Sequence, residues 1–339
     1  MNFALTDDQQ AMRDSLRRFL DDEPAPSWAS LCELGVMAVL LPHARGGIGG
    51  GGSDIALVFE ELGHACVASP ALSCVMVSTY AGLEDELLRG NVIAPALYEE
   101  AGRYDHHWCE AVATGEGSQV KVTGEKSVVL DAGIAAAFLV SARLDDKPAL
   151  VHVPAEAHGV SVQASATMDG GQIGHVILND TMGTVLDANP GRMIASGLLA
   201  LGAEALGMMD AVRDMTVDYL KQRKQFGKPL SEFQVLQHRL ADMAMAIEQV
   251  RSGVLNAAAA YDQHDGKLSI ELHALKVQVG EIGRLVAEEA IQLHGGIGMT
   301  QEYALGKYAK RLIMMDHLLG DADWHLMQFV EISKLETAQ

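Results

Sequence analysis

Cysteine is scarce in this sequence. The 339 residues include only Cys32, Cys66, Cys74 and Cys109, and no two of them have the CxxC spacing. A chain of this length can bury a large hydrophobic core without the help of disulfides. The pattern favours a reducing compartment, so we expect a cytoplasmic protein.

Basic residues are also few. Lys and Arg number 25 against 45 Asp and Glu, which gives a formal net charge of −20. Such a charge repels the phosphates of nucleic acids and an anionic membrane surface. The start of the chain lacks a basic and then apolar leader, and no uninterrupted apolar run of about 18 residues follows. We expect neither a nucleic-acid partner nor a membrane partner.

Metal-binding patterns are missing as well. The 13 histidines form no HxxxH or HExxH set, and the pair His106 and His107 stands alone in a β-rich region. Zinc sites in proteins usually show such spacings. We therefore predict no metal site.

The hydrophobic patterns predict three domains of an α+β protein. Residues 1–93 show helical periodicity, with Thr6 and Gln9 spaced as a capping box. Residues 94–188 contain short β-rich runs separated by Gly, Asp and Pro, as in a small barrel or sandwich. Residues 189–339 return to long helices and predict a bundle of four or five. Some of these helices are apolar on more than one face, which favours packing in an oligomer.

One interhelical segment of the bundle reads RKQFGKPLSEFQ, residues 223–234. In its simplest interpretation this is a turn, in which one helix stops at Phe226 and Gly227 and the next starts with Ser231 as its N-cap. Alternatively, Arg223 and the backbone amides of the turn bind an anionic group such as a pyrophosphate.

A second segment, QLHGGIG at residues 292–298, is equally ambiguous. Two glycines after a long helix are most often a C-cap. They also allow a ligand to approach the backbone closely, with the amide of Gln292 beside it.

The α–β–α order and these two segments, about 70 residues apart, together resemble the acyl-CoA dehydrogenase family. Further pieces of the resemblance are LCELGVMAVLLPHARGGIG and FEELG, then VTGEKSVVLDAG and FLVSAR, then LADM. The resemblance covers nearly the whole chain. It implies an acyl-CoA dehydrogenase-like fold with an N-terminal helical domain, a central β domain and a C-terminal helical bundle.

The resemblance also implies a chemistry and an assembly. Family members are tetramers that oxidise an acyl-CoA thioester to the 2,3-enoyl-CoA with FAD, and electron-transfer flavoprotein is the expected electron acceptor. A glutamate removes the α-proton while the β-hydride passes to the flavin. Each flavin lies at a subunit interface, with its ring on one subunit and its ADP half on the bundle of the neighbour.

The residues that match the family's ADP side are present. By position in the two motifs they are Arg223, Gln225, Phe226, Leu230, Phe233, Gln292, Gly295 and Gly296. The resemblance therefore implies that this chain holds the ADP half of a neighbour's FAD.

The residues of the ring side differ from the family pattern. Where the family reads TEP-x-x-GSD, this chain has YEEAGRYD, so Tyr98 replaces the threonine. Val128 stands in place of a tryptophan that flanks the flavin, and Leu130 in place of a threonine that hydrogen-bonds it. Aliphatic side chains leave the polar edge of a buried ring unsatisfied.

The catalytic glutamate is missing from both positions where family members carry it. The position after the Q-x-x-G-G turn is Leu319, and the alternative position on the first bundle helix is Gly197. The resemblance thus implies no catalytic base in this chain, with Asp321 and Asp316 as the nearest substitutes.

Three hypotheses follow. In the first, this chain is the short subunit of a heterotetrameric acyl-CoA dehydrogenase, resembling actinobacterial enzymes that act on steroid side-chain CoA thioesters, and a longer partner subunit supplies the glutamate. In the second, it is a self-sufficient homotetrameric dehydrogenase with Asp321 or Asp316 as a displaced base. In the third, it is a non-enzymatic scaffold or regulatory paralogue.

Overall fold

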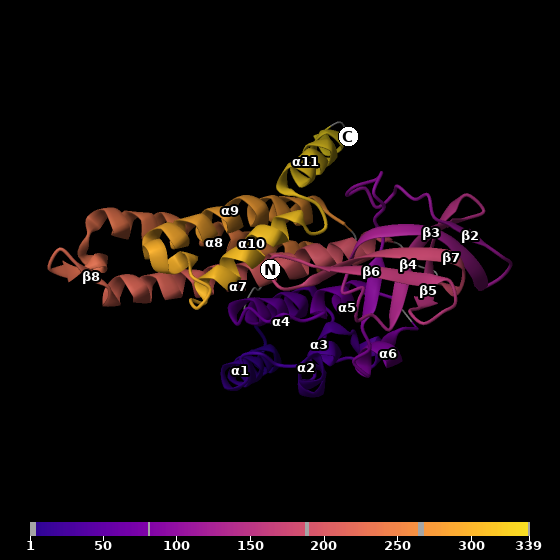
Figure 1. The fold of residues 1–339 in the computed structure, drawn as a ribbon, viewed down its shortest axis with the longest axis horizontal. Coiled ribbons are helices and arrows are strands. Elements are labelled where there is room, and N and C mark those ends of the chain that lie inside the picture. Colours follow the sequence, from indigo (N-terminus) through magenta and orange to yellow (C-terminus); the bar gives the residue numbers. More distant parts are fainter. Residues whose placement is uncertain (1–4, 81, 187–189, 264–267, 338–339) are drawn as a thin grey trace.

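The computed structural model describes residues 5–80, 82–186, 190–263 and 268–337 and contains three regions (Figure 1). A helical bundle lies along the long axis, a β domain lies at one end of it, and the N-terminal helices pack along one side. The predicted fold class is confirmed. The exact domain boundaries stay predictions, and the one between residues 188 and 189 lies outside the described residues.

The N-terminal region consists of helices, of which α1 and α4 are the longest. Its elements are α1 (Asp7–Asp22), α2 (Trp28–Leu34), α3 (Val36–Leu40), α4 (Gly52–His64), α5 (Ala71–Val77) and α6 (Glu84–Leu88). The predicted capping box of α1 is present. The backbone N–H of Gln9 donates to Thr6 Oγ1 at 3.2 Å, and the backbone N–H of Thr6 donates to Gln9 Oε1 at 3.1 Å.

The central region is a small closed barrel. Its strands are β1 (Ile93–Ala96), β2 (Val112–Thr114), β3 (Gln119–Leu130), β4 (Ala137–Leu144), β5 (Lys147–Pro154), β6 (Val160–Ala166) and β7 (Gln172–Leu186). The pairings β2–β3, β3–β7, β7–β5, β5–β4 and β4–β2 close a ring. In addition, β1 pairs with β4 and β6 pairs with β7. Buried side chains such as Val122, Phe138 and Val176 form part of its core.

The C-terminal region is the predicted bundle. Its elements are α7 (Pro190–Gln222), β8 (Lys224–Gln225), β9 (Lys228–Pro229), α8 (Gln234–Gln263), α9 (Ile270–His294), α10 (Leu305–His317) and α11 (Ala322–Thr337). By length and composition α7 could cross a membrane, but its most apolar stretch is entirely buried inside the fold. A core helix that is covered on all sides has this composition. Helix α11 projects from the rest of the bundle (Figure 1).

Helices α4 and α7 pack with their backbones in near contact. A Cβ atom on Gly63 would lie 2.0 Å from the backbone oxygen of Glu204, and one on Gly207 would lie 1.9 Å from that of Glu60. Only glycine fits at such distances. The N-terminal region is therefore fixed directly against the central helix of the bundle.

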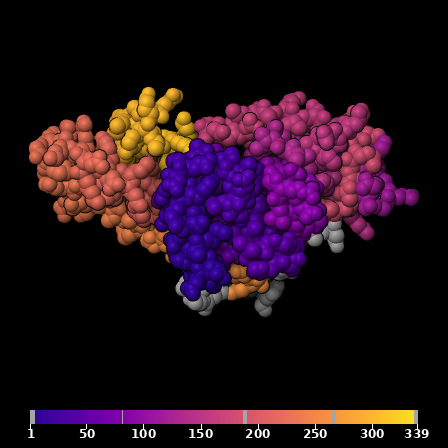
Figure 2. Space-filling model, turned by 90° about the horizontal axis from the view of Figure 1, so that it is seen from below, coloured from indigo at the N-terminus to yellow at the C-terminus, as the bar shows by residue number. Residues whose placement is uncertain are grey.

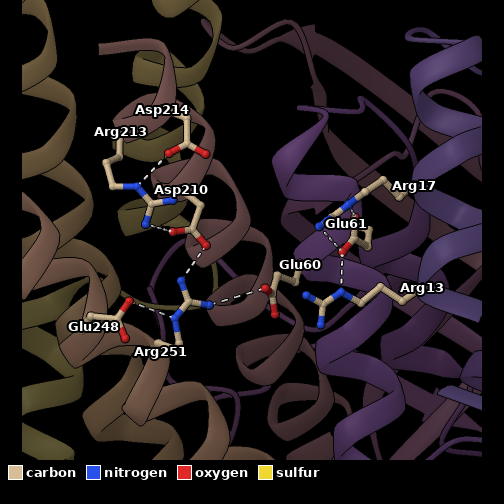
Figure 3. A network of polar contacts seen from close by, with 9 residues as sticks. All are labelled: Arg13, Arg17, Glu60, Glu61, Asp210, Arg213, Asp214, Glu248 and Arg251. Carbon is tan, nitrogen blue, oxygen red and sulfur yellow. Dashed lines mark hydrogen bonds and ion pairs between the residues drawn. The ribbon is translucent and has the colours of Figure 1, made fainter. Parts of the chain in front are cut away.

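A network of ion pairs reinforces the same junction (Figure 3). The buried carboxylate of Glu61 on α4 accepts hydrogen bonds from Arg17 of α1 at 2.8 and 2.9 Å, and Arg13 lies 3.2 Å away. On the other side of α4, Arg251 of α8 pairs with Asp210 of α7 at 2.7 Å and lies 3.5 Å from Glu60. The two parts of the network connect the first helix of the chain with the bundle.

Candidate functional site

The segment between α7 and α8 is a miniature hairpin. Helix α7 ends at Gln222, and β8 pairs with β9 across a two-residue turn in which Phe226 and Gly227 have φ of 54° and 85°. Positive φ at both central residues is typical of a type I′ turn. The prediction that the first helix continues to Phe226 is therefore wrong.

The predicted N-cap at Ser231 is also wrong. Ser231 lies inside a short 3-10 helix, Leu230–Glu232, and α8 begins only at Gln234. The backbone N–H of Leu230 donates to the backbone oxygen of Arg223 at 2.8 Å, which closes the hairpin back onto the end of α7. The 3-10 helix thus lies between the hairpin and the start of α8.

The ADP-side residues predicted from the sequence lie at the end of the bundle farthest from the β domain. The α7–α8 hairpin occupies this end and projects beyond the N-terminal helices (Figures 1 and 2). Rings of Tyr219 on α7 and His294 on α9 stack with centroids 4.5 Å apart. This contact brings the segment that begins at Arg223 close to the Gly295–Gly296 turn.

Most of these residues are exposed and open to a ligand. Phe226 is 90% exposed, and Arg223 is exposed with no acidic partner among the described residues. A Cβ atom on Gly295 or Gly296 would meet nothing within 4 Å, so a ligand can approach the backbone there. An unpaired guanidinium beside an open glycine turn suits a pyrophosphate.

The two positions at which the family carries its base lie in contact. A Cβ atom on Gly197 would be 2.6 Å from Cδ1 of Leu319 and 3.0 Å from Cγ of Met76. Both Leu319 and Met76 are buried. Helix α7 and the α10–α11 connection thus meet at one point, and hydrocarbon groups from three segments occupy it.

The backbone around Leu319 is held in an unusual conformation. Leu319 has φ of 58°, in the left-handed region that side chains other than glycine seldom adopt. The buried ammonium of Lys276 donates to the backbone oxygens of Asp316 at 2.8 Å and Gly320 at 2.5 Å. Burial lowers the pKa of Lys276 to about 8.

A pair of buried histidines supports the same connection. His325 Nε2 donates to the backbone oxygen of Leu319 at 3.0 Å, so its Nδ1 accepts from His273 Nδ1–H at 2.8 Å. Burial lowers the pKa of His273 to about 4 and that of His325 to about 3. The sequence does not predict this pair, because the two histidines are 52 positions apart and show no ligand-like spacing.

The two aspartates near Leu319 serve as backbone acceptors. Asp321 accepts the N–H of Trp324 at 2.8 Å and so caps α11, while Asp316 accepts the N–H of Ala322 at 3.0 Å. Asp321 also lines the cavity beside Leu319, and Asp316 does not.

That cavity corresponds to the predicted ring side. It has a volume of about 360 Å³ and lies between the β domain and the α10–α11 connection, with Tyr98, Tyr104, Val128, Leu130 and Leu319 among its lining residues. The hydroxyl of Tyr98 is buried and has no hydrogen-bond partner among the described residues. The lining is mixed in polarity, but Val128 and Leu130 are aliphatic at the two positions where the family carries a tryptophan and a threonine against the flavin ring.

Val128 enters this cavity from a bulge. The register of β3 against β7 shifts between Lys126 and Val129, and Val128 has φ of 53° with its side chain 49% exposed. A positive φ is rare for a β-branched residue. The bulge therefore presents an aliphatic side chain at the place where the family carries its tryptophan.

A buried ion pair supports the floor of the cavity. Lys126 Nζ lies 2.6 Å from Glu99 Oε1 and 2.8 Å from the hydroxyl of Ser141. Burial alone would raise the pKa of Glu99, but Lys126 and the backbone N–H groups of Glu110 and Ala111 outweigh it and lower that pKa. Glu99 is therefore a structural anion and is not free to act as a base.

The ADP-side residues and the ring-side cavity are far apart within one chain. Gly197 marks the cavity end of α7 and Arg223 follows its other end, 26 positions later. At the rise of an α-helix this is about 39 Å. One dinucleotide does not reach from one place to the other, so the exposed ADP-side residues suit a flavin whose ring lies on another chain.

No group of three or more potential metal ligands gathers anywhere in the described part of the chain.

Comparison with known proteins identifies the family. The N-terminal domain of acyl-CoA dehydrogenases matches residues 6–84, and their C-terminal domain matches residues 192–332. The probable acyl-CoA dehydrogenase YngJ of Bacillus subtilis is 29% identical, with 97% of this chain and 98% of YngJ covered. Acyl-CoA dehydrogenase IpdE2 of Mycolicibacterium smegmatis is 30% identical, with 92% and 88% covered.

Solved structures share the whole fold. A variant of the Tcur3481–Tcur3483 steroid ACAD matches with a TM-score of 0.88 and 26% identity, covering 98% of this chain and 99% of its own. Other structures of this fold include a complex with FAD and one with FADH2. The chain belongs to the acyl-CoA dehydrogenase family, whose members are flavin-dependent oxidoreductases with FAD as their cofactor.

Proposed function

We propose that this chain is one subunit of a heteromeric acyl-CoA dehydrogenase. It provides the ADP-side half of an interfacial FAD site, and a longer subunit of the same family provides the flavin-ring half, the acyl-CoA pocket and the catalytic glutamate. FAD supplies the hydride acceptor of the reaction when it is bound. This chain contributes the exposed Arg223 guanidinium and the open Gly295–Gly296 turn, which bind phosphates.

The contact between Gly197 and Leu319 carries this proposal. Neither base position carries a carboxylate, and the space beside Gly197 is filled by Leu319 and Met76. In the chain's own cavity, Val128 and Leu130 also replace the family's tryptophan and threonine, which contact the flavin ring. The ADP half of the family's site is thus present and exposed, while the ring half lacks the base and two of the family's flavin contacts.

The substrate and the partners follow from this division. We propose an acyl-CoA thioester as substrate and electron-transfer flavoprotein as electron acceptor. The similar structure is described as the Tcur3481–Tcur3483 steroid ACAD, a description that names two components and a steroid. This likeness supports a heterotetramer and a steroid side-chain CoA ester for this chain. A cytoplasmic location stays a prediction.

The test is to purify the chain alone and together with a glutamate-bearing acyl-CoA dehydrogenase subunit. We expect little FAD and no acyl-CoA oxidation with the isolated chain, and about one FAD per two chains with activity in the complex. Arg223→Ala should strip FAD from the complex, while Lys221→Ala, an exposed cation two positions away, should not. Full FAD occupancy and activity of the isolated chain would overturn the proposal.

A further inference from the structure

Three aromatic rings join the two motifs of the ADP side. Tyr219 lies in the last turn of α7, His294 is the last residue of α9, and Tyr303 precedes α10. The ring of His294 stacks on Tyr219 and lies 5.1 Å from the ring of Tyr303, centroid to centroid. The rings of Tyr219 and Tyr303 meet edge to face at 6.5 Å. Three separate elements are therefore held together at one point.

Hydrogen bonds fix the protonation and orientation of His294. Its Nδ1 lies 2.8 Å from the backbone oxygen of Ala290, which only accepts, so Nδ1 carries the hydrogen. In the neutral ring Nε2 then accepts the hydroxyl hydrogen of Tyr303 at 3.1 Å. His294 is only 3% exposed, and burial lowers its pKa. Both ring nitrogens are satisfied by protein groups, so His294 has no nitrogen left for a ligand.

The same ring lies next to both ligand-facing segments. The backbone oxygen of Tyr219 accepts the N–H of Arg223 at 2.8 Å. Gly295 directly follows His294 and ends α9 with φ of 66°. A shift of the His294 ring against Tyr219 would therefore move the glycine turn relative to the arginine.

We propose that His294 is a positioning residue, which fixes the distance between Arg223 and the Gly295–Gly296 turn so that both contact the ADP half of one FAD. This inference rests on the proposed function. Both segments are exposed ends of helices, and ordering them only upon binding would weaken the affinity. The buried, doubly hydrogen-bonded ring orders them in advance.

The test uses the complex of this chain with its glutamate-bearing partner, freed of flavin and titrated with FAD. His294→Phe keeps an aromatic ring against Tyr219 but removes both hydrogen bonds. We expect its Kd for FAD to rise about tenfold, which corresponds to about 1.4 kcal/mol. Tyr303→Phe, which removes a single hydroxyl, should raise the Kd a few-fold, and the double variant should be no worse than His294→Phe.

A cycle with Arg223→Ala separates positioning from general stability. When Arg223 is absent, there is no guanidinium to position, so adding His294→Phe should change the Kd less than threefold. Equal losses in both backgrounds, or no loss in His294→Phe, would overturn the inference while leaving the proposed function in place. If Arg223→Ala itself leaves FAD binding unchanged, the proposed function fails as well. Tyr303→Phe serves as the folded variant if His294→Phe does not assemble.

Discussion

A Cβ atom on Gly197 would lie 2.6 Å from Cδ1 of Leu319. The two residues belong to segments that are more than a hundred positions apart, and each stands where some family members carry the catalytic base. Their contact shows that side chains at the two alternative base positions reach the same place in the fold. In this chain neither position carries a carboxylate.

Restoring a glutamate at this point should not restore activity to the isolated chain. We expect no acyl-CoA oxidation by Leu319→Glu or Gly197→Glu alone, because Val128 and Leu130 still replace the side chains with which the family holds the flavin ring. Leu319→Glu should also lower the free energy of unfolding by about 2 kcal/mol, since a carboxylate enters an apolar contact. Dye-linked oxidation assays and denaturant unfolding measure these effects. Leu319→Gln is the uncharged control, and turnover by Leu319→Glu alone would contradict the prediction.

Asp321 distinguishes the heteromeric enzyme from a self-sufficient one with a displaced base. Asp321→Asn should leave the activity of the complex within about twofold, because asparagine caps a helix as well as aspartate does. Asp316→Asn should behave in the same way. The measurement is kcat with a saturating acyl-CoA substrate. Loss of activity in Asp321→Asn, with FAD still bound, would support the self-sufficient enzyme instead.

The buried pair His273 and His325 should make the protein sensitive to acid. Their pKa values in the folded chain, about 4 and about 3, lie below the value of about 6.5 for an unfolded chain. The unfolded state therefore binds more protons, and stability falls as the pH drops from about 6.5 through about 4. Unfolding by urea between pH 7 and pH 4.5 measures the slope.

A double variant tests the cause of that slope. His273→Gln combined with His325→Gln removes both titrating rings and keeps polar groups near Leu319 and Lys276. Its stability should be lower at pH 7 but should decline less between pH 6.5 and pH 4.5. An unchanged slope would assign the acid sensitivity to other titratable groups of the chain, such as the buried His106.

Glu61 should matter for stability more than other members of the network in Figure 3. Its side chain is 2% exposed and contacts both Arg13 and Arg17, which are partly exposed. Glu61→Gln should lower the free energy of unfolding by about 2 kcal/mol, because the buried hydrogen bonds lose their charge. Glu248→Gln, at a carboxylate that is 61% exposed, should cost less than about 0.5 kcal/mol. Similar losses in the two variants would contradict the importance of burial.

The sequence by itself determined the order of the elements and the identity of the missing groups. Periodicity predicted the helical, β and helical regions, and the capping box at Thr6 and Gln9 predicted the start of α1. These features depend on local geometry, which neighbouring residues fix. The absence of glutamate at Leu319 and Gly197 was equally visible, because it needs only a comparison of positions.

Tertiary structure alone decided how those positions relate. The contact of Gly197 with Leu319, the histidine pair behind it and the ring stack at His294 all join residues that are distant in sequence, and no local pattern encodes such contacts. The hairpin at Phe226 and Gly227 was mispredicted because its two positive φ angles form only where the chain reverses against α7. Sequence thus named the groups that are present or missing, and packing decided that the ADP side is exposed and that Leu319 and Met76 fill the space beside Gly197.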